Sequence, residues 1–268
     1  METDIHKKNE DMKKELLIII PAYNESKSIG ALLDGLEQPE IMEIADLLIV
    51  NDASLDDTGR LAAERGHEVI NNIYNLGYGS GLWVGYKYAV KHGYKYVIQM
   101  DADGQHDVCN VKRLYERLTT PGEGGVCPDI VLGSRFMEGS YPYKSSAVKS
   151  LAYALFRFLI RLGSGIKITD PTTGLQALDR RAFSFYAGYN HFDDKYPDAN
   201  MIMQMLLLGF RVEEVPAVMH YRTEGVSMHS GLKPVIYMFR MVFSIAAIWI
   251  RIKLYHVDAE AAKEDEAD

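Results

Sequence analysis

Acidic and amide side chains gather in short segments, each directly after a run of apolar residues. The acids are Glu25 after LLIII, Asp52 after DLLIV, and Asp101 and Asp103 after YVIQM. Two carboxylates one residue apart, followed by Gln105, offer oxygen ligands without Cys or His, a set that suits Mg²⁺ or Mn²⁺. Such a cation neutralises the charge of a leaving diphosphate. The residues therefore predict metal-assisted chemistry on a substrate that carries phosphate.

The apolar runs before these acids are typical of strands buried on both faces. They occupy residues 16–20, 46–50, 96–100 and 129–132. Between the runs, apolar residues recur at helical spacing, which predicts helices that alternate with the strands. This alternation indicates an α/β fold with a mostly parallel, Rossmann-like sheet flanked by helices. Ligands bind beyond the carboxyl ends of strands in such sheets, so we expect the acids to share one edge.

A glycine-rich segment, NLGYGSGLWVG, begins at Asn75 and follows the third expected strand. A glycine turn that opens a helix can bind phosphate through its free backbone N–H groups. The segment lacks G-x-G-x-x-G and does not follow the first strand, so it is not a nicotinamide-nucleotide fingerprint. A tight turn with close packing between helix and sheet explains the same glycines, and the sequence leaves both interpretations open.

Composition places the chain among ordinary globular proteins. Of its 268 residues, 47% are hydrophobic and 25% are charged, which excludes a disordered or low-complexity protein. The net charge of −8 implies no general attraction to nucleic acid. Cys109 and Cys127 are too few for a disulfide framework or a cysteine metal site. The charged leader at residues 1–14 has no apolar core, so we expect no signal peptide and a cytoplasmic protein, with an acidic tail at 257–268.

Two later segments combine apolar and basic residues and contain no acid, at residues 143–167 and 229–256. We expect an amphipathic helix at about residues 145–162 and a second one at 229–256, both lying on an anionic membrane surface. Their basic stripes are Lys149, Arg157 and Arg161, and Arg240, Ser244, Ala247 and Arg251. Packing of the apolar faces into the core, with the stripes in solvent, is the alternative. The uncharged runs are too short for a transmembrane helix.

In order and spacing, eight motifs resemble those of family-2 glycosyltransferases, which have the GT-A fold. The motifs are IPAYNE, VNDASLDDT, N-x-G-x-G, MDADGQH, GSR, DPTTGLQAL, EVP and YRTEGVS. The last three are similar to the polyprenyl-phosphate sugar synthase branch, of which dolichyl-phosphate mannose synthase is the best-known member. The resemblance spans residues 15–254 and implies a glycosyltransferase domain at residues 15–228.

This resemblance divides the candidate residues between a donor site and an acceptor site. The nucleotide-sugar site would be formed by Pro21, Tyr23, Glu25, Asp52, Asp101, Ala102 and Asp103. Mg²⁺ or Mn²⁺ would be held by Asp103 and Gln105. The diphosphate or the acceptor phosphate would contact Arg135, Arg222 and Ser227, since the arginine fork matches phosphate oxygens. Asp103, Arg135 and Arg222 would therefore be catalytic.

The sequence departs from the family pattern in two places. Tyr78 stands where a lysine is usual, and the segment HFDDKYPDAN at residues 191–200 has no Glu-Asp pair. Asp193, Asp194 or Asp198 could still serve as the general base that a hydroxyl acceptor needs. A polyprenyl monophosphate is largely dianionic at neutral pH and needs no base. The missing pair therefore favours a phosphate acceptor.

We therefore expect an inverting, metal-dependent glycosyltransferase that moves a sugar from a nucleotide-diphosphate sugar to undecaprenyl or dolichyl phosphate. It would be peripherally attached to the cytoplasmic face of the membrane. The close alternative adds the sugar to a hydroxyl of a lipid-linked or cell-surface saccharide. More distant alternatives are a sugar nucleotidyltransferase, which would release pyrophosphate, and a non-catalytic subunit that binds nucleotide sugars.

Overall fold

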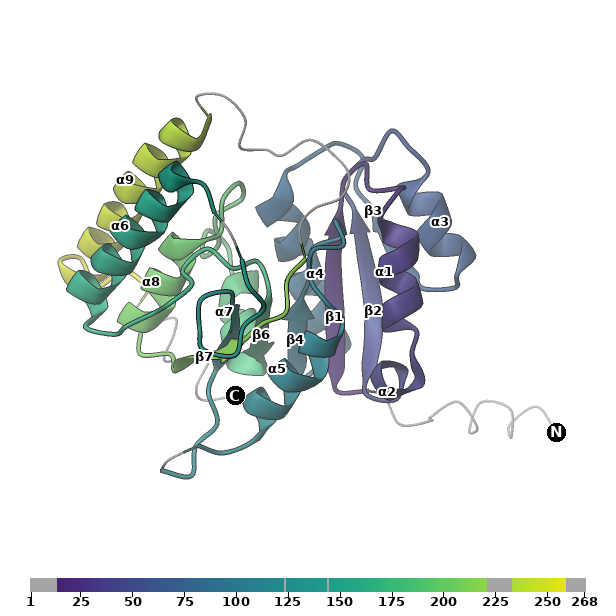
Figure 1. The fold of residues 1–268 in the computed structure, drawn as a ribbon, viewed down its shortest axis with the longest axis horizontal. Helices are drawn as coiled ribbons and strands as arrows, with labels where there is room; N and C mark the ends of the chain where they lie inside the picture. The colour runs from purple at the N-terminus through teal and green to yellow at the C-terminus, as the bar shows by residue number, and fades with distance from the viewer. Residues whose placement is uncertain (1–13, 123, 144, 221–232, 259–268) are drawn as a thin grey trace.

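A computed structural model describes residues 14–122, 124–143, 145–220 and 233–258, which surround a seven-stranded sheet (Figure 1). The sheet order is β3-β2-β1-β4-β6-β5-β7. The strands are β1 (Leu16–Ala22), β2 (Ala45–Asn51), β3 (Glu68–Asn71), β4 (Tyr96–Gln99), β5 (Ile130–Ser134), β6 (Gln176–Asp179) and β7 (Val212–Pro216). Strand β1 is parallel to both β2 and β4, and β2 is parallel to β3. Strand β5 is parallel to β7. The predicted mostly parallel sheet is confirmed.

Strand β6 is the exception, because it runs antiparallel to both β4 and β5. This strand is not among those predicted from the sequence. Its first residue, Gln176, pairs with Gln99 at the end of β4 and with Leu132 in the middle of β5. The reversed direction therefore brings the preceding segment, residues 170–175, to the carboxyl edge where the acids were expected.

Helices cover both faces of the sheet. One face packs against α1 (Ile29–Leu36), α2 (Pro39–Met42), α3 (Thr58–Glu64) and α5 (Cys109–Thr119). The other packs against α4 (Tyr78–His92) and α7 (Arg180–Ala187), whose core continues into α6 (Ala147–Ser164), α8 (Ala199–Leu207) and α9 (Lys233–Lys253). In Figure 1, the last three helices lie together on the side away from β3. Strand β1 is buried along its whole length, as its continuous apolar run predicts.

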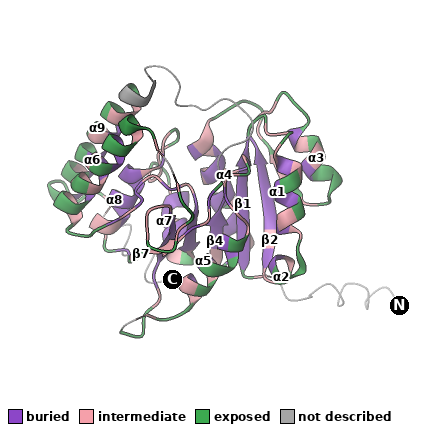
Figure 2. Ribbon diagram, viewed as in Figure 1, coloured by how far each residue is buried: buried purple, intermediate pink, exposed green. Residues whose placement is uncertain are grey.

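Helices α6 and α9 occupy the two segments in which amphipathic helices were predicted, and each packs against α8. Large apolar side chains on their outer faces are 59% to 72% exposed: Leu151, Phe158, Leu162, Ile236, Phe239 and Phe243. Figure 2 shows this outer surface of both helices as mainly exposed. Other apolar side chains of the same helices are buried in the core, among them Phe156 and Ile160 of α6 and Ile245 and Ile248 of α9. Each helix is therefore apolar on both its inner and its outer face, and attachment to a membrane stays a prediction. Within the described residues, no helix is long and apolar enough to cross a bilayer.

Both arginines of the stripe predicted for α9 have acidic partners. The Arg240 guanidinium lies 3.5 Å from the Asp193 carboxylate, and that of Arg251 lies 2.5 Å from Asp258. In α6, the Arg157 guanidinium lies 4.6 Å from the centre of the Phe136 ring. Arg240, Arg251 and Arg157 thus each have a partner within the protein. Arg240 of the α9 stripe and Arg161 of the α6 stripe are nonetheless exposed, whereas Arg157 and Arg251 are half-buried.

Candidate active site

The carboxyl ends of β1, β2 and β4 meet at one edge of the sheet, because these strands are parallel neighbours. At the end of β1, Pro21 and Ala22 are buried, Tyr23 is exposed, and Glu25 is half-buried. The Glu25 carboxylate accepts a hydrogen bond of 2.8 Å from the Ser28 hydroxyl. The structure thus brings the predicted residues of the first motif to the expected edge.

Asp52, at the end of β2, is buried and holds the glycine turn, defined as residues 75–81. One carboxylate oxygen accepts bonds from the Leu76 N–H (2.9 Å) and the Asn72 amide (2.8 Å), and the other from the Gly77 N–H (2.8 Å). Both oxygens therefore have partners within the protein. The predicted contact between Asp52 and the nucleotide remains a prediction, and the observed contacts give this residue a role in shaping the site.

The glycine turn opens α4 and is closed off by residues 193 and 194. The Ser80 N–H donates to the Asp194 carbonyl at 3.1 Å. A Cβ atom at Gly79 would overlap the Asp193 carbonyl oxygen, so only glycine fits there. The amides of Leu76, Gly77 and Ser80 thus have protein partners. The close-packing interpretation of these glycines is confirmed, and those three amides are not a free phosphate cradle.

Asp101, directly after β4, is contacted from two other segments of the edge. The Tyr78 hydroxyl donates to its carboxylate at 2.8 Å, and burial, followed by the charge of Asp101, raises the pKa of Tyr78. The His106 Nδ1 atom accepts a bond of 3.2 Å from the Asp101 backbone N–H. Burial lowers the pKa of His106 to about 4, so this ring is neutral at pH 7. Tyr78 therefore holds the Asp101 carboxylate, and the neutral His106 ring holds the Asp101 backbone.

Asp103 and Gln105 share the tight turn after Asp101. The Gln105 N–H donates to the Asp103 carboxylate at 3.0 Å, and Gly104 between them has a φ of 74°. Both side chains are half-buried, and together they offer carboxylate and amide oxygens, which fit Mg²⁺ or Mn²⁺. In the described ranges, no group of three or more His, Cys, Asp or Glu side chains could hold a metal ion. The ligand pair stays a prediction.

Arg135, after β5, is buried in an ion pair with Asp170. Its guanidinium donates to both Asp170 carboxylate oxygens at 2.6 Å and to the Thr172 hydroxyl at 2.7 Å. The Asp170 side chain is 0% exposed, and that of Arg135 is 8% exposed. Although burial alone lowers the pKa of Arg135, the bonds to Asp170 raise it above its ordinary value. The guanidinium predicted to contact phosphate is thus already neutralised by a bidentate carboxylate.

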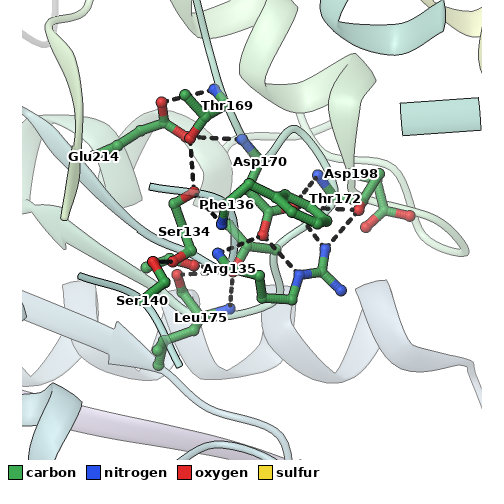
Figure 3. A network of polar contacts seen from close by, with 12 residues as sticks. Ser134, Arg135, Phe136, Ser140, Thr169, Asp170, Thr172, Leu175, Asp198 and Glu214 are labelled. Atoms are coloured by element: carbon green, nitrogen blue, oxygen red, sulfur yellow. Dashed lines mark hydrogen bonds and ion pairs between the residues drawn. The ribbon is translucent and has the colours of Figure 1, made fainter. Parts of the chain in front are cut away.

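The Arg135–Asp170 pair belongs to a larger network that reaches β7 (Figure 3). The Glu214 carboxylate accepts bonds from the backbone N–H groups of Thr169 (2.7 Å) and Asp170 (2.9 Å). The Thr169 hydroxyl in turn lies 2.6 Å from that of Ser134. These bonds explain why DPTTG, GSR and EVP occur together in one sequence, since each motif supplies part of the network.

The acids of segment 191–200 differ in their surroundings. The Asp193 carboxylate accepts bonds of 2.9 Å from the Lys195 and Tyr196 N–H groups and one of 3.0 Å from the Asn200 amide. The Asp194 side chain is exposed, and its carbonyl contacts the glycine turn. Asp193 therefore has a structural role, and Asp194 contributes to the site through its backbone.

Asp198 is the member of this group with a base-like environment. Its carboxylate accepts a 2.7 Å bond from the Tyr237 hydroxyl of α9, and Figure 3 shows it beside Thr172 and Arg135. Burial raises the pKa of Asp198 to about 6, while the bond from Tyr237 and the charge of Arg135 act in the opposite direction. A carboxyl group that titrates near neutral pH is suited to general acid–base chemistry.

Two functional groups of this site were missed by sequence reasoning. Asp170 lies in a motif that was recognised, but no role was assigned to it. Tyr237 precedes Arg240 and Ser244 by three and seven residues, so helical spacing could have placed it on the same face. Arg222 and Ser227, predicted to contact phosphate, lie outside the described residues.

Comparison with known proteins identifies relatives over most of the chain. The model of "Glycosyl transferase family 2" matches residues 17–186. The undecaprenyl-phosphate mannosyltransferase of Micrococcus luteus is 30% identical, over 81% of this chain and 88% of the relative. The polyprenol monophosphomannose synthase of Mycolicibacterium smegmatis is 29% identical, over 80% of this chain and 81% of the relative.

A solved structure shares the fold at lower sequence identity. The glucosyl-3-phosphoglycerate synthase of Mycobacterium tuberculosis, in complex with Mn²⁺, UDP and phosphoglyceric acid, superposes with a TM-score of 0.66. The two proteins are 19% identical, and the match covers 88% of this chain and 78% of the other. This likeness shows the GT-A fold, as the sequence motifs predicted.

Proposed function

The chain belongs to glycosyltransferase family 2, and we propose that it transfers a sugar from a nucleotide-diphosphate sugar to a polyprenyl phosphate. The observation that carries this proposal is that both relatives described above are named for mannose and a polyprenyl phosphate. The match covers 88% of the length of the first relative and 81% of the second, so it is not confined to one part of either protein.

On the donor side, the nucleotide sugar would bind along the edge formed by Pro21, Tyr23, Glu25 and the Asp101 loop. Asp103 and Gln105 would hold Mg²⁺ or Mn²⁺, which neutralises the charge of the departing diphosphate when bound. The bond that the Asp101 carboxylate accepts from Tyr78, and the bond that the Asp101 N–H donates to His106, orient this residue before the donor arrives. Preorganised groups of this kind need no rearrangement during the reaction.

In the proposed reaction, an oxygen of the acceptor phosphate attacks the anomeric carbon from the face opposite to the diphosphate. The bond between that carbon and the diphosphate oxygen breaks, and the nucleoside diphosphate leaves with the electron pair. The configuration at the anomeric carbon is inverted. Because the attacking phosphate is already ionised, no proton has to be removed from it.

Transfer to a sugar hydroxyl is the second candidate, and the environment of Asp198 favours it. A hydroxyl acceptor needs a base, and Asp198 has a pKa of about 6 close to Asp101 and Arg135. Asp194 has no such environment, because its side chain is exposed. The test of the acceptor class therefore centres on Asp198.

We also infer that the protein attaches peripherally to a membrane, at its cytoplasmic face, through α6 and α9. Exposed apolar side chains on adjacent helices mark an interaction surface, and the acceptor of the proposed reaction resides in the bilayer. Arg161 and Lys253 are exposed on the same two helices and favour anionic lipid.

A donor and acceptor screen tests the proposed function. Purified protein is incubated with a panel of nucleotide-diphosphate sugars and Mg²⁺ or Mn²⁺, with and without vesicles that contain polyprenyl phosphate. The proposal expects nucleoside diphosphate release that depends on polyprenyl phosphate for at least one donor. Transfer only to a saccharide hydroxyl would favour the second candidate, and release of pyrophosphate would indicate a nucleotidyltransferase.

A further inference from the structure

The inner face of α9 contacts the segment of residues 193–200 at three points. The Tyr237 hydroxyl donates to Asp198 at 2.7 Å. The Arg240 guanidinium lies 3.5 Å from Asp193, and the Ser244 hydroxyl accepts a bond of 3.0 Å from the Asn200 amide. The three α9 residues are spaced by three and four positions, so they lie on one face of the helix.

The same segment touches the donor side through its backbone. The first N–H groups of a helix have no partner within the helix. In α4, the Ser80 N–H is one of these groups, and it donates a hydrogen bond of 3.1 Å to the Asp194 carbonyl. Gly79 permits this approach, because a side chain there would collide with the Asp193 carbonyl. The segment therefore lies between α9 and the glycine turn and contacts both.

Asp198 lies where groups from several elements converge. Titratable or charged groups that act on it come from α9, β5, β4, α4 and its own segment, namely Tyr237, Arg135, Asp101, Tyr78 and Asp193. Of these, the Tyr237 hydroxyl is the one with a hydrogen bond to the Asp198 carboxylate in the structure. The phenol ring is itself held by edge-to-face contacts with Phe156 and Tyr196.

We propose that Tyr237 is a positioning residue of the active site and that, with Arg240 and Ser244, it makes α9 the element that fixes segment 193–200 against the glycine turn. The placing of Asp198 on the acceptor side rests on the proposed function. The helix that presents Ile236, Phe239 and Phe243 outward thus sets the geometry of a site carboxylate with its inner face.

The first test is Tyr237→Phe, which removes the hydroxyl and keeps the ring that packs against Phe156 and Tyr196. The measurement is the pH titration of ¹³Cγ-labelled aspartate by NMR, with the Asp198 resonance identified by its loss in Asp198→Asn. A hydrogen bond to the ionised form lowers a pKa, so its removal is expected to raise that of Asp198 by about one unit. Tyr189→Phe, which changes a highly exposed tyrosine, is the matched control.

The second test is the double variant Arg240→Gln/Ser244→Ala, read by amide hydrogen exchange at Ser80. If α9 holds the segment, exchange at Ser80 becomes faster by about tenfold or more, while amides in the middle of α4 keep their protection. Because Ser80 is bonded to Asp194 and not to α9, only a displaced segment produces this pattern.

Both readouts use the free protein, so they stand even if the screen finds no transfer to polyprenyl phosphate. A raised Asp198 pKa in Tyr237→Phe together with faster Ser80 exchange in the double variant supports the proposal. An unchanged Asp198 titration overturns the role of Tyr237. Unchanged Ser80 exchange overturns the role of α9 as the element that fixes the segment.

Discussion

The proposed donor side, with Asp52 and Asp103, and the proposed acceptor side, with Arg135 and Asp198, hold their charged groups in different ways. On the donor side, Asp52 and Asp103 accept bonds from backbone N–H groups. On the acceptor side, Arg135 and Asp198 are held by side chains that are 35 and 39 residues distant in sequence. A backbone-bound carboxylate can be replaced without leaving a buried partner charge. Replacing one member of a buried pair leaves the other uncompensated. Substitution of Asp103 should therefore affect mainly turnover, and substitution of Arg135 mainly the free energy of unfolding.

The largest effect is expected for Asp103→Ala. This change should abolish turnover and leave the fold intact. Without this ligand the cation would be lost, and with it several kcal/mol of stabilisation of the charge on the leaving diphosphate. The measurement is the initial rate at limiting Mn²⁺, with circular dichroism to verify folding. The exposed Asp34→Ala serves as a control. Near-normal turnover by a folded Asp103→Ala protein would contradict the metal assignment.

The next largest effect is a loss of stability in Arg135→Met. The Asp170 carboxylate is fully buried, and leaving it unpaired should lower the free energy of unfolding by about 3–5 kcal/mol. Urea denaturation measures this change. Arg60→Gln, which breaks the exposed pair with Glu64, is the control and should leave the midpoint unchanged. Equal midpoints for both variants would refute a structural role for the buried pair.

Gly79→Ala tests the contact between the two sides. The added methyl group would force the Asp193–Asp194 backbone away from α4, at a cost of about 1–3 kcal/mol. Gly30→Ala in α1 is the matched control, since the nearest atom to its new Cβ is 3.9 Å away. That control should be stabilised by about 0.5–1 kcal/mol. Thermal unfolding measures both variants. If Gly79→Ala and Gly30→Ala change the stability equally, the close approach at Gly79 does not contribute to stability.

The smallest expected effect concerns the exposed charges of α6 and α9. Arg161→Gln and Lys253→Gln should each weaken binding to anionic vesicles by about 1 kcal/mol, and added salt should reduce the difference. Vesicle flotation measures the bound fraction. Lys112→Gln, an exposed lysine on α5, should bind as the wild type does. Identical flotation of all three variants would argue against electrostatic attachment through α6 and α9.

The sequence predicted the positions of Asp52 and Asp103 at the sheet edge, but it did not predict the partners of Arg135 and Asp198. Apolar runs followed directly by acids determine where Asp52 and Asp103 lie, because a parallel sheet aligns the ends of its strands. The pairing of Arg135 with Asp170 depends on the reversed direction of β6, which no local pattern encodes. The pairing of Arg240 with Asp193 likewise depends on a contact that only the folded chain makes. Local periodicity identified α9 correctly, but tertiary packing decided which of its faces is outermost.

The most direct test of the central claim is the turnover of Asp198→Asn with a saturating nucleotide sugar and the acceptor preparation on which the wild type is fastest. If a phosphate group attacks the sugar, no general base is needed, and the rate should remain within about tenfold of the wild type. Donor binding, measured separately by calorimetry, should be unchanged. A fall of about 10²- to 10⁴-fold with unchanged donor binding would show that Asp198 acts as a general base. That result would contradict a phosphate acceptor and support transfer to a hydroxyl.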